Sequence, residues 1–392
     1  MGVKLRLAER MSRLGTETAF EVLARARALE AAGREIIHLE IGEPDFDTPA
    51  FIRRAAQKAL EAGFTHYTPS AGLPEVRQVV AEHLSKKVGV PYKAENIVIT
   101  PGAKPILFLS ILALIETGDE VIYPNPGFPI YESAVNFVGG RAVPYPLEEK
   151  SGFRMEGEEL KKLVTGKTRM LIVNSPHNPT GAVMGKKELD EVYDVIKNRE
   201  DIWVLSDEIY SRGLYSGKHI SIASFPGMAE HTIVLDGMSK AYAMTGWRLG
   251  FGAMPEGLAQ AVTQLAINDF SCTSGFGQKA IEAALSGPQE EVEKMVAEFR
   301  VRRDLIVAGL REIPRLSVTE PQGAFYVFPS IKAFGKSSKE MADYLLEKAG
   351  VACLSGTAFG RYGEGYIRFS YANSQKNIGR ALEKIKTALE KI

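Results

Sequence analysis

The feature that most constrains the fold of this chain is a regular alternation of short apolar runs and longer amphipathic segments between residues 95 and 255. Seven of these runs have the length of strands: "NIVIT", "EVIYP", "RAVPYP", "RMLIVNSP", "IWVLSDEIY", "TIVLDGMS" and "RLGFGAM". Helical patterns such as "PILFLSILALIETG" and "KKELDEVYDVIKNRE" separate them. Strands that are apolar along their whole length are buried on both faces, and helices between successive strands allow those strands to run parallel. The pattern predicts an α/β domain whose mostly parallel seven-stranded sheet is flanked by helices.

The pattern changes after residue 255. Residues 256–287 are rich in helical patterns, and "PQEEVEKMVAEFRVRRDLIVAGLREI" predicts a long amphipathic helix with Pro288 near its first turn. Beyond Pro314, the strand-like runs "LSVT", "GAFYVF", "VACLSG" and "YIRFSYA" occur together with the helical patterns "SKEMADYLLEKAG" and "NIGRALEKIKTALEKI". This mixture predicts a smaller α+β lobe.

The length of 392 residues suits more than one domain. We expect an N-terminal segment over residues 1–48, which contains a helix over residues 20–33 and packs with the small lobe. A large α/β domain is expected over residues 49–287 and a small α+β domain over residues 288–392. No low-complexity linker separates these parts, so we expect the lobes to pack together.

The charge balance disfavours two classes of partner. Lysine plus arginine and aspartate plus glutamate each number 48, with no long block of like charge, so nucleic acid and anionic membranes are not expected partners. The longest apolar run is well short of the roughly 20 residues that a membrane span needs. Cys272 and Cys353 lack the paired spacing of a zinc site or a redox dithiol. We therefore expect a cytoplasmic protein that binds no metal.

Two other enzyme classes are not expected, because their sequence motifs are incomplete in this chain. Gly250 and Gly252 begin a dinucleotide-binding fingerprint, but Pro255 stands where its third glycine belongs. The sequence "GMSKA" resembles the nucleophile elbow of a hydrolase, with Ser239 between a strand and a helix. Such a hydrolase needs a histidine after the serine, and all six histidines precede Ser239. A serine hydrolase is therefore not expected.

Polar side chains follow three successive predicted strands. Asn178 in "NSPHNPTG" follows the first strand, Asp207 and Tyr210 in "SDEIY" follow the second, and Lys240 follows the third, with Arg248 eight residues further on. Each residue alone has an ordinary explanation, such as a turn, a helix cap or a surface charge. Parallel strands bring their carboxyl ends to one edge, where open α/β sheets bind ligands. Together, an amine, a carboxylate, a phenol, an amide and a guanidinium match the requirements of pyridoxal 5′-phosphate.

The motifs "NSPHNPTG", "SDEIY", "SKAYAMTGWRLG" and "IRFSYA" occur in the order and spacing of a known family. Over nearly its whole length, the chain resembles the class I/II aminotransferases of fold type I, and it looks closest to the aspartate and aromatic aminotransferase branch. The resemblance implies the fold of the fold type I pyridoxal-phosphate-dependent transferases.

The resemblance assigns roles around the cofactor. Lys240 would hold pyridoxal 5′-phosphate covalently and then carry a proton, with its pKa lowered by burial and nearby cations. Asp207 would pair with the pyridine nitrogen. Tyr210 and Asn178 would donate hydrogen bonds to the ring hydroxyl. The cofactor phosphate has a predicted site of its own, where backbone N–H groups at a strand-to-helix turn and the Arg248 guanidinium receive a dianion; the turn residues are Gly102, Ala103 and Lys104.

Further positions follow the family pattern, with one departure. Phe128 would stack on the pyridine ring, and Tyr67 would reach the phosphate of a neighbouring subunit, which implies a homodimer with shared active sites. The serine that the family often has three residues before the lysine is replaced by Gly237, and Ser239 is the candidate substitute.

The substrate carboxylate would be bound by Arg368 in "GYIRFSYA", together with Asn178 and the backbone of Gly42. We expect an aminotransferase that moves the amino group of an L-amino acid to a 2-oxo acid such as 2-oxoglutarate by a ping-pong mechanism. Lys104 either reads a distal carboxylate, which would favour aspartate and glutamate, or only adds charge near the phosphate.

The sequence leaves three other hypotheses about substrate and function open. Aromatic amino acids are the alternative substrates, because Phe128, Tyr131 and Phe20 are available to line the pocket. A pyridoxal-phosphate-dependent carbon–sulfur lyase would use the same fold and the same lysine. A non-catalytic amino acid sensor is the remaining alternative, although the basic stripe of a DNA-binding protein is absent from the sequence.

Overall fold

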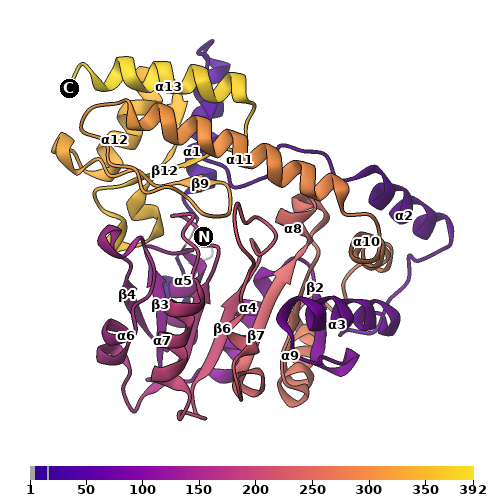
Figure 1. Ribbon diagram of the computed structural model, residues 1–392. Coiled ribbons are helices and arrows are strands. Elements are labelled where there is room, and N and C mark those ends of the chain that lie inside the picture. The colour runs from indigo at the N-terminus through magenta and orange to yellow at the C-terminus, as the bar shows by residue number, and fades with distance from the viewer. Residues whose placement is uncertain (1–4, 16) are drawn as a thin grey trace.

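Seven strands form the central sheet of the computed structural model, which describes residues 5–15 and 17–392 (Figure 1). Their order across the sheet is β2-β8-β7-β6-β5-β3-β4. The strands are β2 (Ile97–Thr100), β3 (Glu120–Asn125), β4 (Arg141–Pro146), β5 (Thr168–Asn174), β6 (Trp203–Asp207), β7 (Thr232–Gly237) and β8 (Gly250–Ala253). Only β8 runs antiparallel to its neighbours β2 and β7. The predicted mostly parallel seven-stranded sheet is confirmed.

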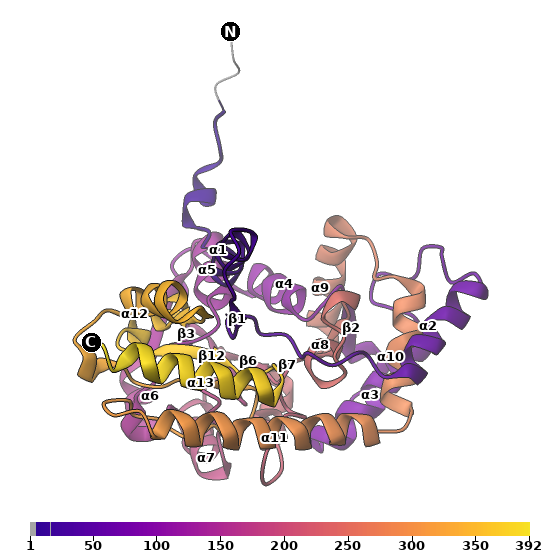
Figure 2. The same ribbon diagram turned by 90° about the horizontal axis from the view of Figure 1, so that it is seen from above.

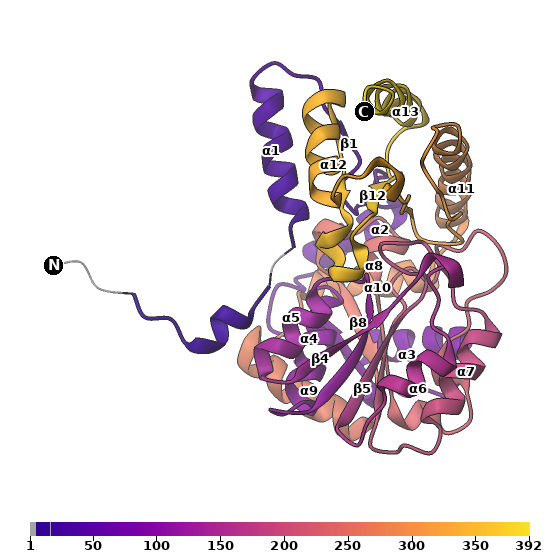
Figure 3. The same ribbon diagram turned by 90° about the vertical axis from the view of Figure 1, so that its left-hand side faces the viewer.

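Helices cover both faces of this sheet (Figure 3). One face packs against α4 (Lys104–Leu114), α5 (Ile130–Val138) and α9 (Glu256–Asp269). The other face packs against α3 (Pro74–Val88), α6 (Gly157–Leu163), α7 (Lys186–Ile196) and α10 (Gly275–Ser286), and α2 (Ala50–Glu61) packs on α10. Alternate residues of one strand serve the two faces: Val98 packs with Ile106 of α4, whereas Ile97 and Ile99 pack with α3. Burial of both faces explains why the strands are apolar throughout.

The strands of the C-terminal lobe are shorter than the sequence predicts. β9 (Tyr326–Val327), β11 (Leu354–Ser355) and β12 (Ile367–Ser370) form an antiparallel sheet, and β10 (Val351–Ala352) pairs with β1 (Ile37–His38). The strand predicted for "LSVT" is wrong, because Ser317 makes only an isolated bridge to Ser330. The lobe also contains α11 (Glu290–Arg311), α12 (Ser338–Tyr344), a π-helical turn (Leu345–Ala349) and α13 (Gln375–Leu389). Pro288 directly precedes the N-cap of α11 and therefore lies near the first turn of the helix, as predicted.

The N-terminal segment contacts both lobes. Its predicted helix is α1 (Ala19–Ala31), which lies beside α12 in Figure 3, and Arg25 forms an ion pair with Asp343 at 2.5 Å. A short 3₁₀ helix (Glu9–Arg13) packs instead on α5 of the large domain. Gly15 N donates a hydrogen bond to Ser133 Oγ on α5 at 2.9 Å. The described residues before this helix extend away from the rest of the chain (Figure 2). The first four residues of the predicted segment 1–48, and residue 16, lie outside the described part.

Within residues 5–15 and 17–392, no helix has both the length and the apolar character required to cross a membrane.

Candidate active site

A cavity of about 590 Å³ lies where β5, β6 and β7 end, against residues of the small lobe. It brings together most of the predicted site residues: Gly42, Ala103, Lys104, Phe128, Asn178, Asp207, Tyr210, Ser239, Lys240, Arg248 and Arg368. These three strands are parallel, so the residues that follow them lie at the same edge of the sheet and line the cavity. Gly102 lies directly against Arg248, next to this lining, whereas Tyr67 belongs to a different region of the surface.

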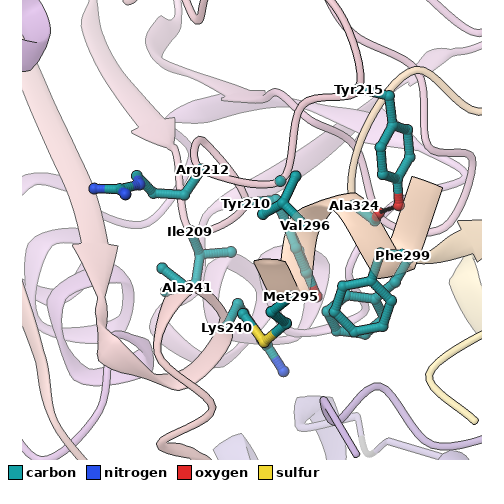
Figure 4. A pocket seen from close by; sticks show the side chains of 12 residues that line it. Ile209, Tyr210, Arg212, Tyr215, Lys240, Ala241, Met295, Val296, Phe299 and Ala324 are labelled. Atoms are coloured by element: carbon teal, nitrogen blue, oxygen red, sulfur yellow. Dashed lines mark hydrogen bonds between the residues drawn. The ribbon is translucent and has the colours of Figure 1, made fainter. Parts of the chain in front are cut away.

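Lys240 enters the cavity from α8 (Met238–Ala241), the short helix that follows β7. Its Nζ donates a hydrogen bond to the backbone oxygen of Gly42 at 2.6 Å. A small apolar pocket lies against the lysine, and Met295 and Phe299 of α11 lie beside it in Figure 4. Burial, assisted by the charge of Arg368, lowers the pKa of Lys240 to about 8. The amine is therefore neutral in about a fifth of the molecules near pH 7.4, far more than for an ordinary lysine.

Asp207 ends β6 and faces the cavity with a buried carboxylate. Tyr131 donates a hydrogen bond to Asp207 Oδ2 at 2.6 Å, and the backbone N–H of Ile209 donates to Oδ1 at 3.3 Å. Burial raises the pKa of Asp207 to about 6 even though the Tyr131 hydrogen bond lowers it. A cationic ligand group beside this carboxylate would favour its charged form. The sequence offered Tyr131 only as a pocket-lining aromatic residue and not as a partner of Asp207.

Tyr210 and Tyr326 form a pair of buried phenols. Their hydroxyl oxygens lie 2.7 Å apart, and burial raises the pKa of both groups. Both hydroxyl groups therefore remain protonated at neutral pH, and the one that accepts within the pair keeps its own proton for another acceptor. Sequence reasoning missed Tyr326, because "GAFYVF" reads as an apolar strand and only the fold brings its tyrosine to the cavity.

Arg368 projects from β12 and is only 4% exposed. Its Nη1 donates a hydrogen bond to Asn178 Oδ1 at 3.0 Å, and its Nη2 donates to the backbone oxygen of Glu40. The rings of Tyr326 and Phe359 flank the guanidinium at 4.4 and 4.8 Å. Within the described part of the chain, the buried Nε has no acceptor. A buried guanidinium with a free donor favours an incoming anion, and a carboxylate fits its planar fork.

The start of α4 and the turn before β8 form a second cationic end of the cavity. Because β8 pairs with β2, Arg248 reaches the loop that joins β2 to α4. Gly102 has a φ of +91°, and a Cβ there would lie 2.2 Å from Arg248 Nη2. Glycine therefore lets the guanidinium approach the backbone, beside the N-terminus of the helix at Ala103 and Lys104. Helix N-termini and arginine together bind phosphates well.

Gly237, where the family often has a serine, is in close contact with β8. A Cβ at this position would lie 3.0 Å from the Cα of Gly250 and 3.1 Å from the oxygen of Leu249. A side chain here would require these neighbours to shift by a few tenths of an ångström. Ser239, two residues later, is buried and lines the cavity.

Lys104 points toward the N-terminal segment. Its Nζ forms an ion pair with Glu17 and lies 5.5 Å from the centroid of the Phe128 ring. Glu17 also lines the cavity, and its side chain is 22% exposed. No sequence motif pointed to Glu17, which lies 87 residues from its partner.

Tyr67 is 91% exposed and does not line the cavity of its own chain. It borders a shallow surface hollow together with Phe64, Cys272 and Phe276. An exposed tyrosine ring is a candidate for contact with another molecule.

A cluster of buried charged side chains contacts the strand ends that carry the site. Lys87 of α3 places its Nζ 2.9 Å from Glu208 Oε2 and 2.7 Å from Asp236 Oδ2. Glu208 directly follows Asp207, and Asp236 lies in β7, just before the helix of Lys240. His219 Nε2 also lies 2.8 Å from Glu208 Oε2. The cluster connects α3 to the strand ends that carry the site.

Comparisons with known proteins agree over most of the chain. A family model described as "Aminotransferase class I and II" matches residues 34–385. An aspartate aminotransferase of Pyrococcus horikoshii is 41% identical over 387 residues, which cover 98% of this chain and 97% of that protein. An aromatic-amino-acid aminotransferase 2 of Thermococcus litoralis is 42% identical over 359 residues, or 91% of this chain and 92% of that protein. A crystal structure of the aspartate aminotransferase from Rhizobium meliloti matches with a TM-score of 0.95 and 35% identity, covering 99% of both chains.

Proposed function

The chain belongs to the class I and II aminotransferases, and from this premise we propose that it moves the amino group of aspartate or glutamate to a 2-oxo acid such as 2-oxoglutarate. The two half-reactions follow a ping-pong order, in which the first product leaves before the second substrate binds. One observation carries the proposal: a lysine amine, an aspartate carboxylate and a guanidinium, all buried, line a single cavity. The proposed cofactor is pyridoxal 5′-phosphate.

The residues of the cavity fit this cofactor. The glycine at position 102 leaves room for Arg248 beside the N-terminus of α4, and this end would hold the phosphate. Asp207 would pair with the ring nitrogen and keep it protonated. Phe128 lines the same cavity and offers its ring face to a planar ligand. When bound, pyridoxal 5′-phosphate supplies an electron-withdrawing ring that stabilises negative charge on the substrate Cα.

Lys240 has two proposed tasks. As a neutral amine, Lys240 would hold the cofactor through Nζ, and the same Nζ would move a proton at the substrate Cα. A pKa of about 8 suits both tasks, because the amine is a sufficient base and is not permanently charged. The apolar side chains behind it, among them Met295 and Phe299, exclude water from that side of the amine.

The remaining polar groups orient the reactants. Tyr210 and Asn178 would donate hydrogen bonds to the ring hydroxyl, and Ser239 would assist at the phosphate. The free Nε and the planar fork of Arg368 would receive the substrate α-carboxylate, close to the backbone of Gly42. Lys104 would bind the distal carboxylate that distinguishes aspartate and glutamate from other amino acids.

Aromatic amino acids are a second candidate substrate class. Phe20, Phe128 and Phe359 all line the cavity and offer apolar surface to an aromatic side chain. The relatives above include an enzyme named for each class.

We also propose a homodimer in which Tyr67 reaches the phosphate site of the partner subunit. The high exposure of Tyr67, away from the cavity of its own chain, supports this assignment. Two free thiols, at Cys272 and Cys353, support a cytoplasmic location. The proposed domains remain residues 1–48, 49–287 and 288–392, with α11 at the start of the last.

The test is a set of half-reactions with the purified, cofactor-loaded protein. Each of a panel of amino acids is added alone, and the change in the cofactor absorbance is followed; 2-oxoglutarate is then added to reverse it. Fastest conversion by aspartate and glutamate is the expected result, whereas fastest conversion by phenylalanine or tyrosine would assign the aromatic class. Pyruvate and ammonia formed without an oxo acid would reveal a β-eliminating lyase.

The attachment site is tested separately by borohydride reduction and peptide mass spectrometry. The cofactor mass should appear on the peptide that contains Lys240 and be absent from a Lys240→Ala variant. No absorbance change with any amino acid, or no cofactor on that peptide, would overturn the proposal.

A further inference from the structure

Glu17 brings a carboxylate of the chain itself into the proposed substrate cavity. It forms an ion pair with Lys104, the residue to which the proposed function assigns the distal carboxylate of the substrate. The Glu17 side chain is 22% exposed and that of Lys104 is 46% exposed, so the pair is partly shielded from water. In the structure, the carboxylate of Glu17 is therefore paired with the Lys104 ammonium group, which a dicarboxylic substrate would need for its distal carboxylate.

The segment that carries Glu17 is fixed on both sides of the cavity. Before it, the N–H of Gly15 donates to Ser133 Oγ on α5 of the large domain. After it, α1 is held on the small lobe by the ion pair of Arg25 with Asp343 and by the buried side chain of Ala26. Described residues on either side of Glu17 are thus held on different lobes, and the Glu17 carboxylate lies against Lys104.

A single ammonium group cannot pair equally well with two carboxylates. A substrate with a distal carboxylate would place two negative charges beside Lys104, and Glu17 must then move away. A substrate with an uncharged side chain presents the opposite problem, because it would desolvate Lys104 without offering a partner. Glu17 removes this second cost by remaining on Lys104.

We propose that Glu17 is a specificity-determining residue, which neutralises Lys104 when the substrate side chain is uncharged and leaves Lys104 when a substrate brings a distal carboxylate. The inference rests on the proposed function, because it requires Lys104 to read that carboxylate. Such an exchange would allow one cavity to bind both dicarboxylic and aromatic substrates.

The test compares two unreactive ligands on the cofactor-loaded enzyme by calorimetric titration. Succinate carries two carboxylates, and 3-phenylpropionate carries one carboxylate and an aromatic ring; neither has an amino or oxo group. In Glu17→Gln, succinate should bind about two- to fivefold more tightly, as expected for removal of a partly shielded competing ion pair. The affinity for 3-phenylpropionate should fall by about twofold or more, because Lys104 then faces an apolar ligand without a partner.

The opposite signs make the test specific. Loss of a negative charge that merely repels anions would tighten the binding of both ligands, and that result, or no change for either, would overturn the inference. Glu21→Gln provides the matched control, because Glu21 is an exposed carboxylate in the first turn of α1 and both affinities should stay unchanged.

Lys104→Met separates the inference from the proposed function. If Lys104 reads the distal carboxylate, this variant binds succinate about tenfold or more weakly. Unchanged succinate binding in Lys104→Met would refute the proposed substrate class and, with it, the role of Glu17. Weakened binding in Lys104→Met together with unchanged binding in Glu17→Gln would refute the inference alone.

Discussion

Replacing Lys87 with methionine removes a cation from between two buried carboxylates while keeping most of the side-chain volume. Glu208 is 1% exposed, Asp236 is 8% exposed and Lys87 is 12% exposed, so this is a buried cluster and not a surface pair. Breaking a buried pair costs about 3–5 kcal/mol, against at most about 1 kcal/mol for an exposed one. His219, 2.8 Å from Glu208, and the hydroxyl of Ser221 remain as polar partners of this carboxylate. We therefore expect a loss of about 3 kcal/mol in the free energy of unfolding, at the lower end of the range for a buried pair.

The loss should depend on pH in a defined direction. Burial raises the pKa of Glu208, but the charges of Lys87 and His219 lower it by more, so that the pKa lies well below its usual range. A carboxylate with a lowered pKa in the folded state contributes stability above its ordinary pKa and loses that contribution as the pH falls. Without Lys87, Glu208 takes up a proton more readily. The difference between wild type and variant should therefore be largest near pH 7.5 and narrow toward pH 5.

Urea unfolding followed by circular dichroism, at one fixed protein concentration, measures this difference. Lys86→Met is the matched control, because Lys86 is the exposed neighbour on the same helix and its loss should change the free energy of unfolding by less than about 0.5 kcal/mol. The triple variant Lys87→Met, Glu208→Gln, Asp236→Asn should recover most of the loss, because no charge is left unpaired. A loss below about 1 kcal/mol in Lys87→Met, or a triple variant no more stable than the single one, would refute the reasoning.

Three further predictions concern the site. The first is the rate at which the apoprotein attaches pyridoxal 5′-phosphate, followed by absorbance. This rate should rise with pH and level off above about pH 8, because only the neutral Lys240 amine reacts. A flat profile between pH 6.5 and 9.5 would contradict the lowered pKa. Arg368→Lys should raise KM for the amino donor about 10- to 100-fold in steady-state assays, because an ammonium group cannot replace the planar fork; an unchanged KM would exclude Arg368 from carboxylate binding. Gly102→Ala should weaken the affinity for the cofactor, measured by equilibrium dialysis, by about tenfold or more. The added Cβ would collide with Arg248, and residue 102 has a φ of +91°, which favours glycine. The control is Gly33→Ala, because Gly33 also has a left-handed backbone but has open space around it, and this variant should keep its affinity for the cofactor.

The sequence predicted those parts of the fold that depend on local pattern. All seven strands of the large sheet were found, because each is buried on both faces and therefore apolar along its length. The failure at "LSVT" has the opposite cause: Leu316 and Val318 are apolar, but the chain meets a partner only at Ser317, so no ladder forms. A short apolar alternation predicts a strand only when a neighbouring strand is available.

The same distinction applies to the site. Asn178, Asp207 and Lys240 were predictable because parallel strands place their carboxyl ends at one edge of the sheet. Partners that come from distant parts of the chain were not: Tyr131 meets Asp207 across 76 residues, Tyr326 meets Tyr210 across 116, and Glu17 meets Lys104 across 87. These contacts are products of tertiary packing, and no local spacing encodes them.

The antiparallel strand β8 of the large sheet also fixes the separation between two residues of the site. β7 and β8 are joined by one loop, and the pairing of Gly237 with Gly250 closes that loop at its base. Lys240 and Arg248 both lie within the closed loop, so their separation is set by the short chain between them and by the sheet beneath. The residue proposed to hold the cofactor covalently and the arginine proposed to bind its phosphate are therefore kept at a set separation, which would select a cofactor by its length as well as by its charge.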